Sequence, residues 1–129
     1  MNRKKQREWI FKIIFENQIN EVSNIKDSFY NHEIDLGEDS FCYLSLKSYL
    51  ENYDDINEII LNQIGKSSFN RLSKADKSIL FLSINEIFYL EIPVSVSINE
   101  AVNLSKKYST SDGYKFINSV LGKISKKRL

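Results

Sequence analysis

The 129-residue chain is poor in residues that interrupt or cross-link a fold, with one proline, four glycines and one cysteine. So few turn-forming residues favour long helices over many short strands. A lone cysteine excludes an internal disulfide and a cysteine metal cluster. Cys42 lies in the apolar run 41–44, which predicts a buried thiol and a reducing, cytoplasmic setting.

The chain also has few of the groups that an active site needs. His32, the only histidine, has no neighbour in sequence that would orient it as a general base. The glycines are isolated, so no phosphate-cradling loop exists, and the pair Asp54-Asp55 reads as the acidic start of a helix. We therefore expect no catalysis, no cofactor and no metal.

No apolar stretch approaches the length of a membrane span. The apolar run 9–15 follows basic residues, as in a secretory signal, but Lys12 interrupts it and no small-residue cleavage site follows. We expect neither a membrane segment nor a signal peptide.

The net charge of +1 conceals a strong asymmetry along the chain. The first twelve residues carry five cations against Glu8 alone, and the last seven carry four cations and no acid. Between residues 33 and 58, eight acids face only Lys47. A near-neutral total is therefore compatible with a polyanionic partner, because the basic surface is local.

Apolar residues recur at helical spacing along most of the chain and predict an all-α fold of about seven helices with no strand. The expected N-caps are Ser23, Asp39 or Ser40, Ser73, and Ser111 or Asp112. Ser97 and Glu100 are expected to form a capping box. The expected helices cover about 7–18, 22–32, 40–52, 54–65, 73–92, 97–108 and 112–124.

Basic residues precede an aromatic-rich first helix, and single-stranded RNA is held by cations and by stacking on aromatic faces. Two alternatives remain open at this point. In the first alternative to RNA binding, residues 3–7 are a solvated tail. In the second, Trp9 and Phe11 beside lysines mark a helix that lies on a membrane surface. The apolar side of that helix is wide enough to be core instead.

The second half of the chain carries a series of short segments in a distinctive order, from Asn85-Glu86-Ile87 through Pro93 to 97–102, 106–108 and 115–121. Their order and spacing resemble the NusB family of bacterial transcription antitermination factors. The family reads Tyr-Glu-Leu, a proline turn, Ile-Asn-Glu-Ala-Val, Ala-Lys-Lys-Phe and Lys-Phe-Val-Asn-Gly-Val-Leu. The resemblance implies one domain, 1–129, made of two small helical bundles of about 1–65 and 70–129.

The resemblance also implies a site. In this family an Arg-rich N-terminus and the turn before the last helix contact a single-stranded RNA element called boxA. Asp76 matches an acidic position near NusE, a small-subunit ribosomal protein that is the family's partner. The alternative for Asp76 is a capping-box acid, and the alternative for Phe116 is a core residue. The implied RNA-binding residues are Arg3, Lys4, Lys5, Arg7, Phe15, Tyr108, Asp112, Lys115 and Phe116.

Several positions depart from the family pattern. Phe15 and Tyr108 stand where tyrosine and phenylalanine are common, Lys12 where glutamine is frequent, and Gly122 where an acid is common. A similar domain also occurs fused ahead of RNA methyltransferases, but no cofactor-binding domain follows here. The resemblance thus implies a stand-alone factor that joins transcription elongation complexes on ribosomal RNA operons. The alternative is a protein-only helical module or homodimer without RNA binding.

Overall fold

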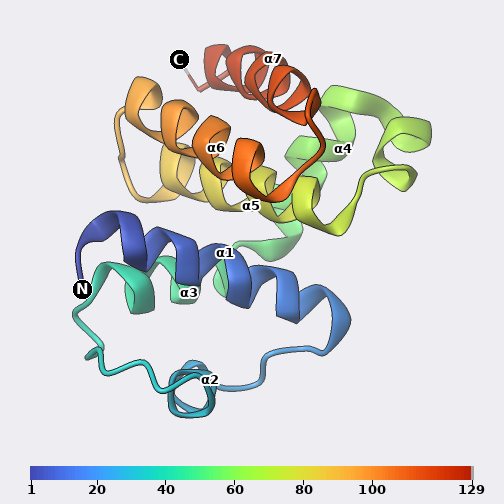
Figure 1. Cartoon of the computed structure of the whole chain (residues 1–129). Coiled ribbons are helices and arrows are strands. Elements are labelled where there is room, and N and C mark those ends of the chain that lie inside the picture. Colours follow the sequence, from blue (N-terminus) through green and yellow to red (C-terminus); the bar gives the residue numbers. More distant parts are fainter. Residues whose placement is uncertain (129) are drawn as a thin grey trace.

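Seven α-helices and their connections make up residues 1–128, the part of the chain that the computed structural model describes (Figure 1). Within this range no strand forms, which confirms the predicted all-α class. No helix in this range is both long enough and apolar enough to cross a membrane. The helices are α1 (Arg3–Ile19), α2 (Ile25–Asn31), α3 (Phe41–Glu51), α4 (Tyr53–Asn70), α5 (Lys74–Tyr89), α6 (Val94–Tyr108) and α7 (Gly113–Lys126).

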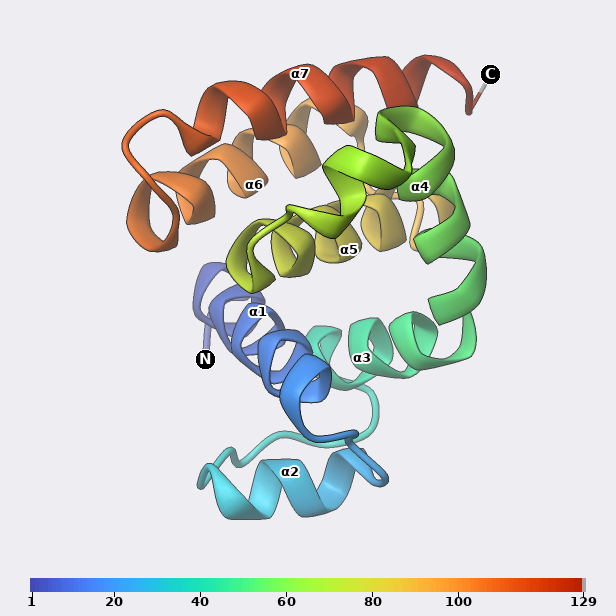
Figure 2. The ribbon, with the colours of Figure 1, turned by 90° about the vertical axis from the view of Figure 1, so that its right-hand side faces the viewer.

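Helix α5 is the centre of the molecule. Ten consecutive residues, 78–87, are buried, and a helix enclosed on all sides must be covered by its neighbours. It packs against α1, α3, α4, α6 and α7. Figure 2 shows α1–α3 on one side and α5–α7 on the other, with α4 running between them. One cluster of buried apolar residues includes side chains from every helix, and the division into two sub-bundles stays a prediction.

Side-chain caps begin several helices, as the sequence pattern predicts. The hydroxyls of Ser40 and Ser73 accept hydrogen bonds from the backbone amides of Tyr43 and Asp76, at 3.1 and 3.0 Å respectively. The starts of the first two helices differ from expectation. Asn24, one residue after Ser23, caps α2, and Asn2 caps α1 four residues earlier than predicted. The cations at 3–5 therefore belong to the first turn of a helix and are not a solvated tail.

The predicted capping box at Ser97 is wrong. Helix α6 begins at Val94, directly after Pro93, because the fixed φ of proline suits the residue that precedes a helix. Ser97 therefore lies inside α6, and its buried hydroxyl donates to Glu86 Oε1 at 2.9 Å. Asp112 is the N-cap residue of α7, but its side chain makes no capping hydrogen bond.

Gly65 interrupts α4 at the position where the sequence predicts the end of a helix. Its backbone has φ 84° and ψ 160°, a conformation that residues with a Cβ almost never adopt, and the chain resumes helical geometry up to Asn70. The bend lets α4 reach both α5 and α7.

We expect Gly65→Ala to lower the free energy of unfolding by about 1–3 kcal/mol, the cost of that backbone conformation for a residue with a Cβ. No atom lies within 4 Å of the added Cβ, so the loss would be backbone strain without a clash. Gly122→Ala is the matched control, because it is equally open but lies in a regular helix and should stabilise by about 0.5–1 kcal/mol. Urea unfolding measures both, and equal effects would contradict the assignment of strain.

Candidate nucleic-acid interface

Most of the predicted RNA-contacting residues lie where α1 meets the turn between α6 and α7. The rings of Phe11 and Tyr108 stack with their centroids 4.7 Å apart and join the two elements. The hydroxyl of Tyr108 also donates to Glu8 Oε1 at 2.9 Å. Because Asp112, Lys115 and Phe116 follow Tyr108 closely, they are carried to the same edge of the molecule.

An aromatic groove opens at this junction. Its volume is about 400 Å³, and its walls are mainly the rings of Phe11, Phe15 and Tyr108, with Ala75 and the exposed Lys12. The centroids of Phe11 and Phe15 lie 6.3 Å apart. Phe15 and Tyr108 are half-buried beside the cation of Lys12, which suits a nucleobase that stacks on aromatic faces while its phosphate meets the cation. The structure thus brings Phe15 and Tyr108 together, although 92 residues separate them in the sequence.

The first turn of α1 supplies further exposed cations, about two to three turns before the groove residues of the same helix. Lys4 and Lys5 are exposed, and the guanidinium of Arg3 lies 4.3 Å from the ring centroid of Phe41 on α3. Lys4 also lines a second hollow, of about 200 Å³, between α1 and α6. Its other charged residues are of both signs: Arg7, Glu8, Glu100 and Lys107.

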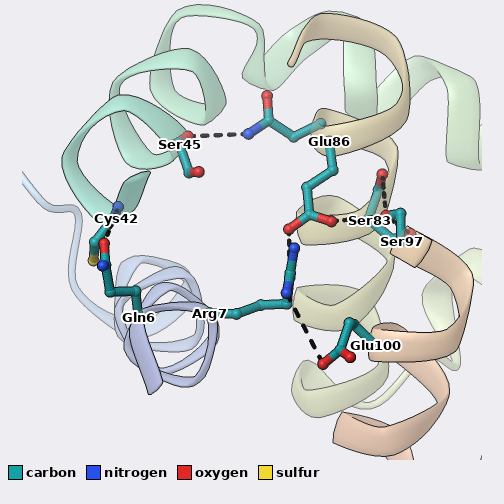
Figure 3. A network of polar contacts seen from close by, with 9 residues as sticks. Gln6, Arg7, Cys42, Ser45, Ser83, Glu86, Ser97 and Glu100 are labelled. Carbon is teal, nitrogen blue, oxygen red and sulfur yellow. Dashed lines mark hydrogen bonds and ion pairs between the residues drawn. The ribbon is translucent and has the colours of Figure 1, made fainter. Parts of the chain in front are cut away.

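Arg7 does not belong to this exposed set, which corrects its sequence-based assignment. It is 4% exposed, and its Nε donates to Glu86 Oε2 at 2.7 Å (Figure 3). Glu100 Oε2 lies 3.9 Å from Nη1. A guanidinium already engaged in the interior is not free to hold a phosphate. No local pattern indicates this pair, because Glu86 lies 79 residues further along the chain.

Glu86 is the centre of a buried polar network that joins α1, α5 and α6. One carboxylate oxygen accepts from Arg7 and the other from Ser97, whose hydroxyl lies 2.8 Å from that of Ser83. Burial raises the pKa of Glu86 above its ordinary value, and the hydrogen bond and charge of Arg7 act in the opposite direction. Figure 3 shows the Arg7 side chain reaching from α1 toward α5 and α6.

Glu8 is a functional candidate that the sequence reasoning missed. Its carboxylate accepts from Lys107 Nζ at 3.0 Å as well as from the Tyr108 hydroxyl, and Lys12 Nζ lies 3.9 Å away. The hydrogen bond from Lys107 is the main cause that lowers the pKa of Glu8, so the group is held as a carboxylate. Glu8 orients the Tyr108 ring. The one signal in the sequence was tyrosine at a position where the family commonly has phenylalanine, which lacks the hydroxyl.

The turn between α6 and α7 is fastened by Asp76. Its Oδ1 accepts from the Ser109 hydroxyl at 2.6 Å, while its backbone amide is capped by Ser73. The carboxylate thus binds the turn instead of reaching back to the Ser73 amide as a capping-box acid would. The turn is tight, because a Cβ on Gly113 would collide with the Ser109 hydroxyl.

The head of α7 presents the last predicted contacts. Phe116 is 37% exposed, which excludes its alternative assignment to the core. Asp112 Oδ1 lies 3.5 Å from Lys115 Nζ, and both side chains are exposed.

Cys42 is fully buried, as predicted, and burial raises the pKa of its thiol to about 12.

An all-helical body with a basic, aromatic edge defines the class of this protein, and comparison with known proteins identifies the family. Residues 4–126 match the NusB family. Transcription antitermination protein NusB of Clostridium novyi (strain NT) is 39% identical over 132 residues, covering 98% of this chain and 99% of the relative. The chain therefore belongs to the NusB family.

Solved structures share the fold. NusB of T. maritima superposes with a TM-score of 0.86 at 27% identity, covering 98% of this chain and 92% of that one. A chain in the crystal structure of the antitermination factors NusB and NusE in complex with dsRNA has a TM-score of 0.80 at 22% identity. That match covers 97% of this chain and 96% of the other.

We expect Arg7→Met to lower the free energy of unfolding by about 3–5 kcal/mol at neutral pH, because it leaves the Glu86 carboxylate buried and unpaired. The loss should depend on pH. A carboxyl with a raised folded-state pKa is most favourable below its unfolded pKa, near 4.5, and loses that advantage as pH rises through the folded value. The deficit should therefore shrink as pH falls toward 4.5.

Urea unfolding at a series of pH values measures this effect. The double variant Arg7→Met, Glu86→Leu removes both charges and should recover much of the loss, with a flatter pH dependence. A deficit in the single variant that does not change with pH would contradict the role of Glu86.

Proposed function

We propose that this chain is a non-enzymatic, cytoplasmic antitermination factor that pairs with NusE and binds boxA-type single-stranded RNA in ribosomal RNA operon transcripts. It would act there within the transcription elongation complex. The single observation that carries the proposal is the aromatic groove beside the exposed cations of α1. Stacking surfaces and free cations at one edge are what a short single strand requires.

The RNA-binding set follows from exposure. We assign phosphate contacts to Arg3, Lys4 and Lys5, and stacking to Phe15 and Tyr108 in the aromatic groove. Asp112, Lys115 and Phe116 extend the surface along the head of α7. Arg7 is withdrawn from this set and assigned a structural role, because its guanidinium is paired with Glu86 in the interior.

Pairing with NusE follows from the size of the surface and from the relatives. A few phosphate contacts and two or three stacked bases give modest affinity by themselves, so a joint surface is needed for tight binding. The fold is shared with a structure in which NusB and NusE are bound to dsRNA. We assign Asp76, which is half-buried beside the α6–α7 turn, to the side that faces NusE.

The test is a titration of a short boxA-like RNA with and without NusE, using wild type and Phe15→Ala. Loss of one stacked base should weaken binding by about 1–3 kcal/mol, roughly 5- to 150-fold. Tyr30→Ala is the matched control, because that ring is 85% exposed on α2, outside the aromatic groove, and should have no effect.

Melting temperatures of the same variants separate binding from folding. If Phe15→Ala melts early yet binds RNA normally when folded, the ring is core and leaves the site. Wild type that binds no boxA-like RNA even with NusE would instead favour a protein-only module or homodimer.

Asp112 offers a second test, because it places a negative charge on the proposed RNA surface. Its side chain makes no capping hydrogen bond, and its exposed pair with Lys115 is of a kind that contributes little. We expect Asp112→Asn to leave stability unchanged. It should bind RNA more tightly than wild type, because a repulsion of roughly 1 kcal/mol at contact distance in water is removed.

The gain should be clearest at low salt, where screening is weak. Asp35→Asn, in the exposed loop after α2, removes the same charge elsewhere and should change nothing. Equal RNA affinity for wild type and Asp112→Asn at low ionic strength would show that this turn points away from the RNA.

A further inference from the structure

Helix α7 and the residue that follows it carry exposed lysines, and of these the interface described above uses only Lys115. No acidic residue follows Asp112 in the sequence. We name the exposed cations Lys115, Lys123, Lys126 and Lys127 the α7 lysine track. In the part of the chain that the structure describes, Lys115 has Asp112 nearby, and no carboxylate lies within 4.0 Å of the other three.

Helical spacing places Lys115 and Lys126 on the side of α7 away from the core and Lys123 at the flank of that side, and Lys127 directly follows the helix. The inner face is Ile117, Val120, Leu121 and Ile124, all buried. Lys115 and Lys126 are eleven residues apart, close to three full turns, so they lie on one line opposite that face. The positions between them on this line are Ser119 and Gly122, and a Cβ on Gly122 would meet no atom within 4 Å. The line thus has a lysine at each end and only small, uncharged residues between them.

Complementing the helix dipole explains only part of this pattern. Lys123 and Lys126 lie in the last turn of α7, where a cation stabilises the helix end. Lys115 lies at the opposite end, where a cation gains nothing from the dipole. Cations at both ends of a helix that holds no acidic residue instead create a local positive potential that attracts a polyanion.

The track is continuous with the proposed RNA surface. The α6–α7 turn connects Tyr108 to the head of α7, and Lys115 and Phe116 belong to both surfaces. At 1.5 Å per residue, the line from Lys115 to Lys126 runs for about 16 Å. In Figure 2, α7 leads from the α6–α7 turn, along the top of the molecule, to the C-terminus. A strand that leaves the aromatic groove by this turn meets Lys115 first and the lysines at the last turn of α7 after it.

We propose that the α7 lysine track is a second binding surface for phosphates of the RNA that flanks the boxA element. It reads charge and not sequence, because lysines contact the phosphate backbone and small residues allow that backbone to approach. This inference rests on the proposed function, since the strand must first be placed by the aromatic groove.

The test compares three RNAs in the presence of NusE: a short boxA-like strand, and the same strand extended by uridines at its 5′ or its 3′ end. Wild type should bind one extended strand more tightly than the short one. Two additional phosphate contacts should make its log–log salt slope steeper by about 1.4, using roughly 0.7 per contact for single strands.

The variant Lys123→Gln, Lys126→Gln should lose both the gain in affinity and the additional slope, and should bind the short strand as wild type does. Lys26→Gln, Lys47→Gln removes two exposed charges on α2 and α3 and should keep the gain. Lys123→Arg, Lys126→Arg preserves the charge and should keep it too. A melting temperature for each variant shows that it is folded.

Two outcomes overturn the proposal and are distinct from each other. If wild type binds the short strand but neither extension helps, or if the gain survives in Lys123→Gln, Lys126→Gln, the track does not bind RNA and only serves solubility and the helix dipole. If wild type with NusE does not bind even the short strand, the proposed function fails, and this inference fails with it.

Discussion

The buried ion pair between Arg7 and Glu86 determines where the candidate interface can form. Placing two charges in the interior is costly, and the cost is offset only because each charge has a close partner and further hydrogen bonds. Since Glu86 lies in the central helix α5 and Ser97 in α6, the pair sets how α1 lies against both helices. Every surface that α1 shares with its neighbours depends on that position.

The first two turns of α1 divide their charged side chains between the interior and the surface. Arg7 points inward to Glu86, Lys4 and Lys5 stay exposed, and Glu8 holds the phenol of Tyr108 and the ammonium of Lys107. A single helix therefore fixes the core, orients a ring of the aromatic groove and supplies free cations. The number of basic residues in a sequence cluster is therefore only an upper limit on the number of cations that a ligand can contact.

The sequence predicted features that depend on near neighbours better than features that depend on distant ones. Seven helices and the caps at Ser40 and Ser73 follow from local patterns, and the structure contains them. Arg7 and Ser97 were misassigned because Glu86, the group that both bind, is distant in sequence from Arg7 and carries no local signal. Phe15 and Tyr108 were chosen by resemblance, and no periodicity could show that their rings share a groove.

The α6–α7 turn gives a physical reason why two partners would bind better together than apart. Asp76, assigned to the side that faces NusE, is joined by one hydrogen bond to Ser109, the residue that directly follows Tyr108. A protein contact that holds Asp76 restricts the same turn that a stacked base on Tyr108 must also hold in place. Under the proposed function the cost of ordering the turn is borne by whichever partner binds first, and the second then binds an already rigid surface.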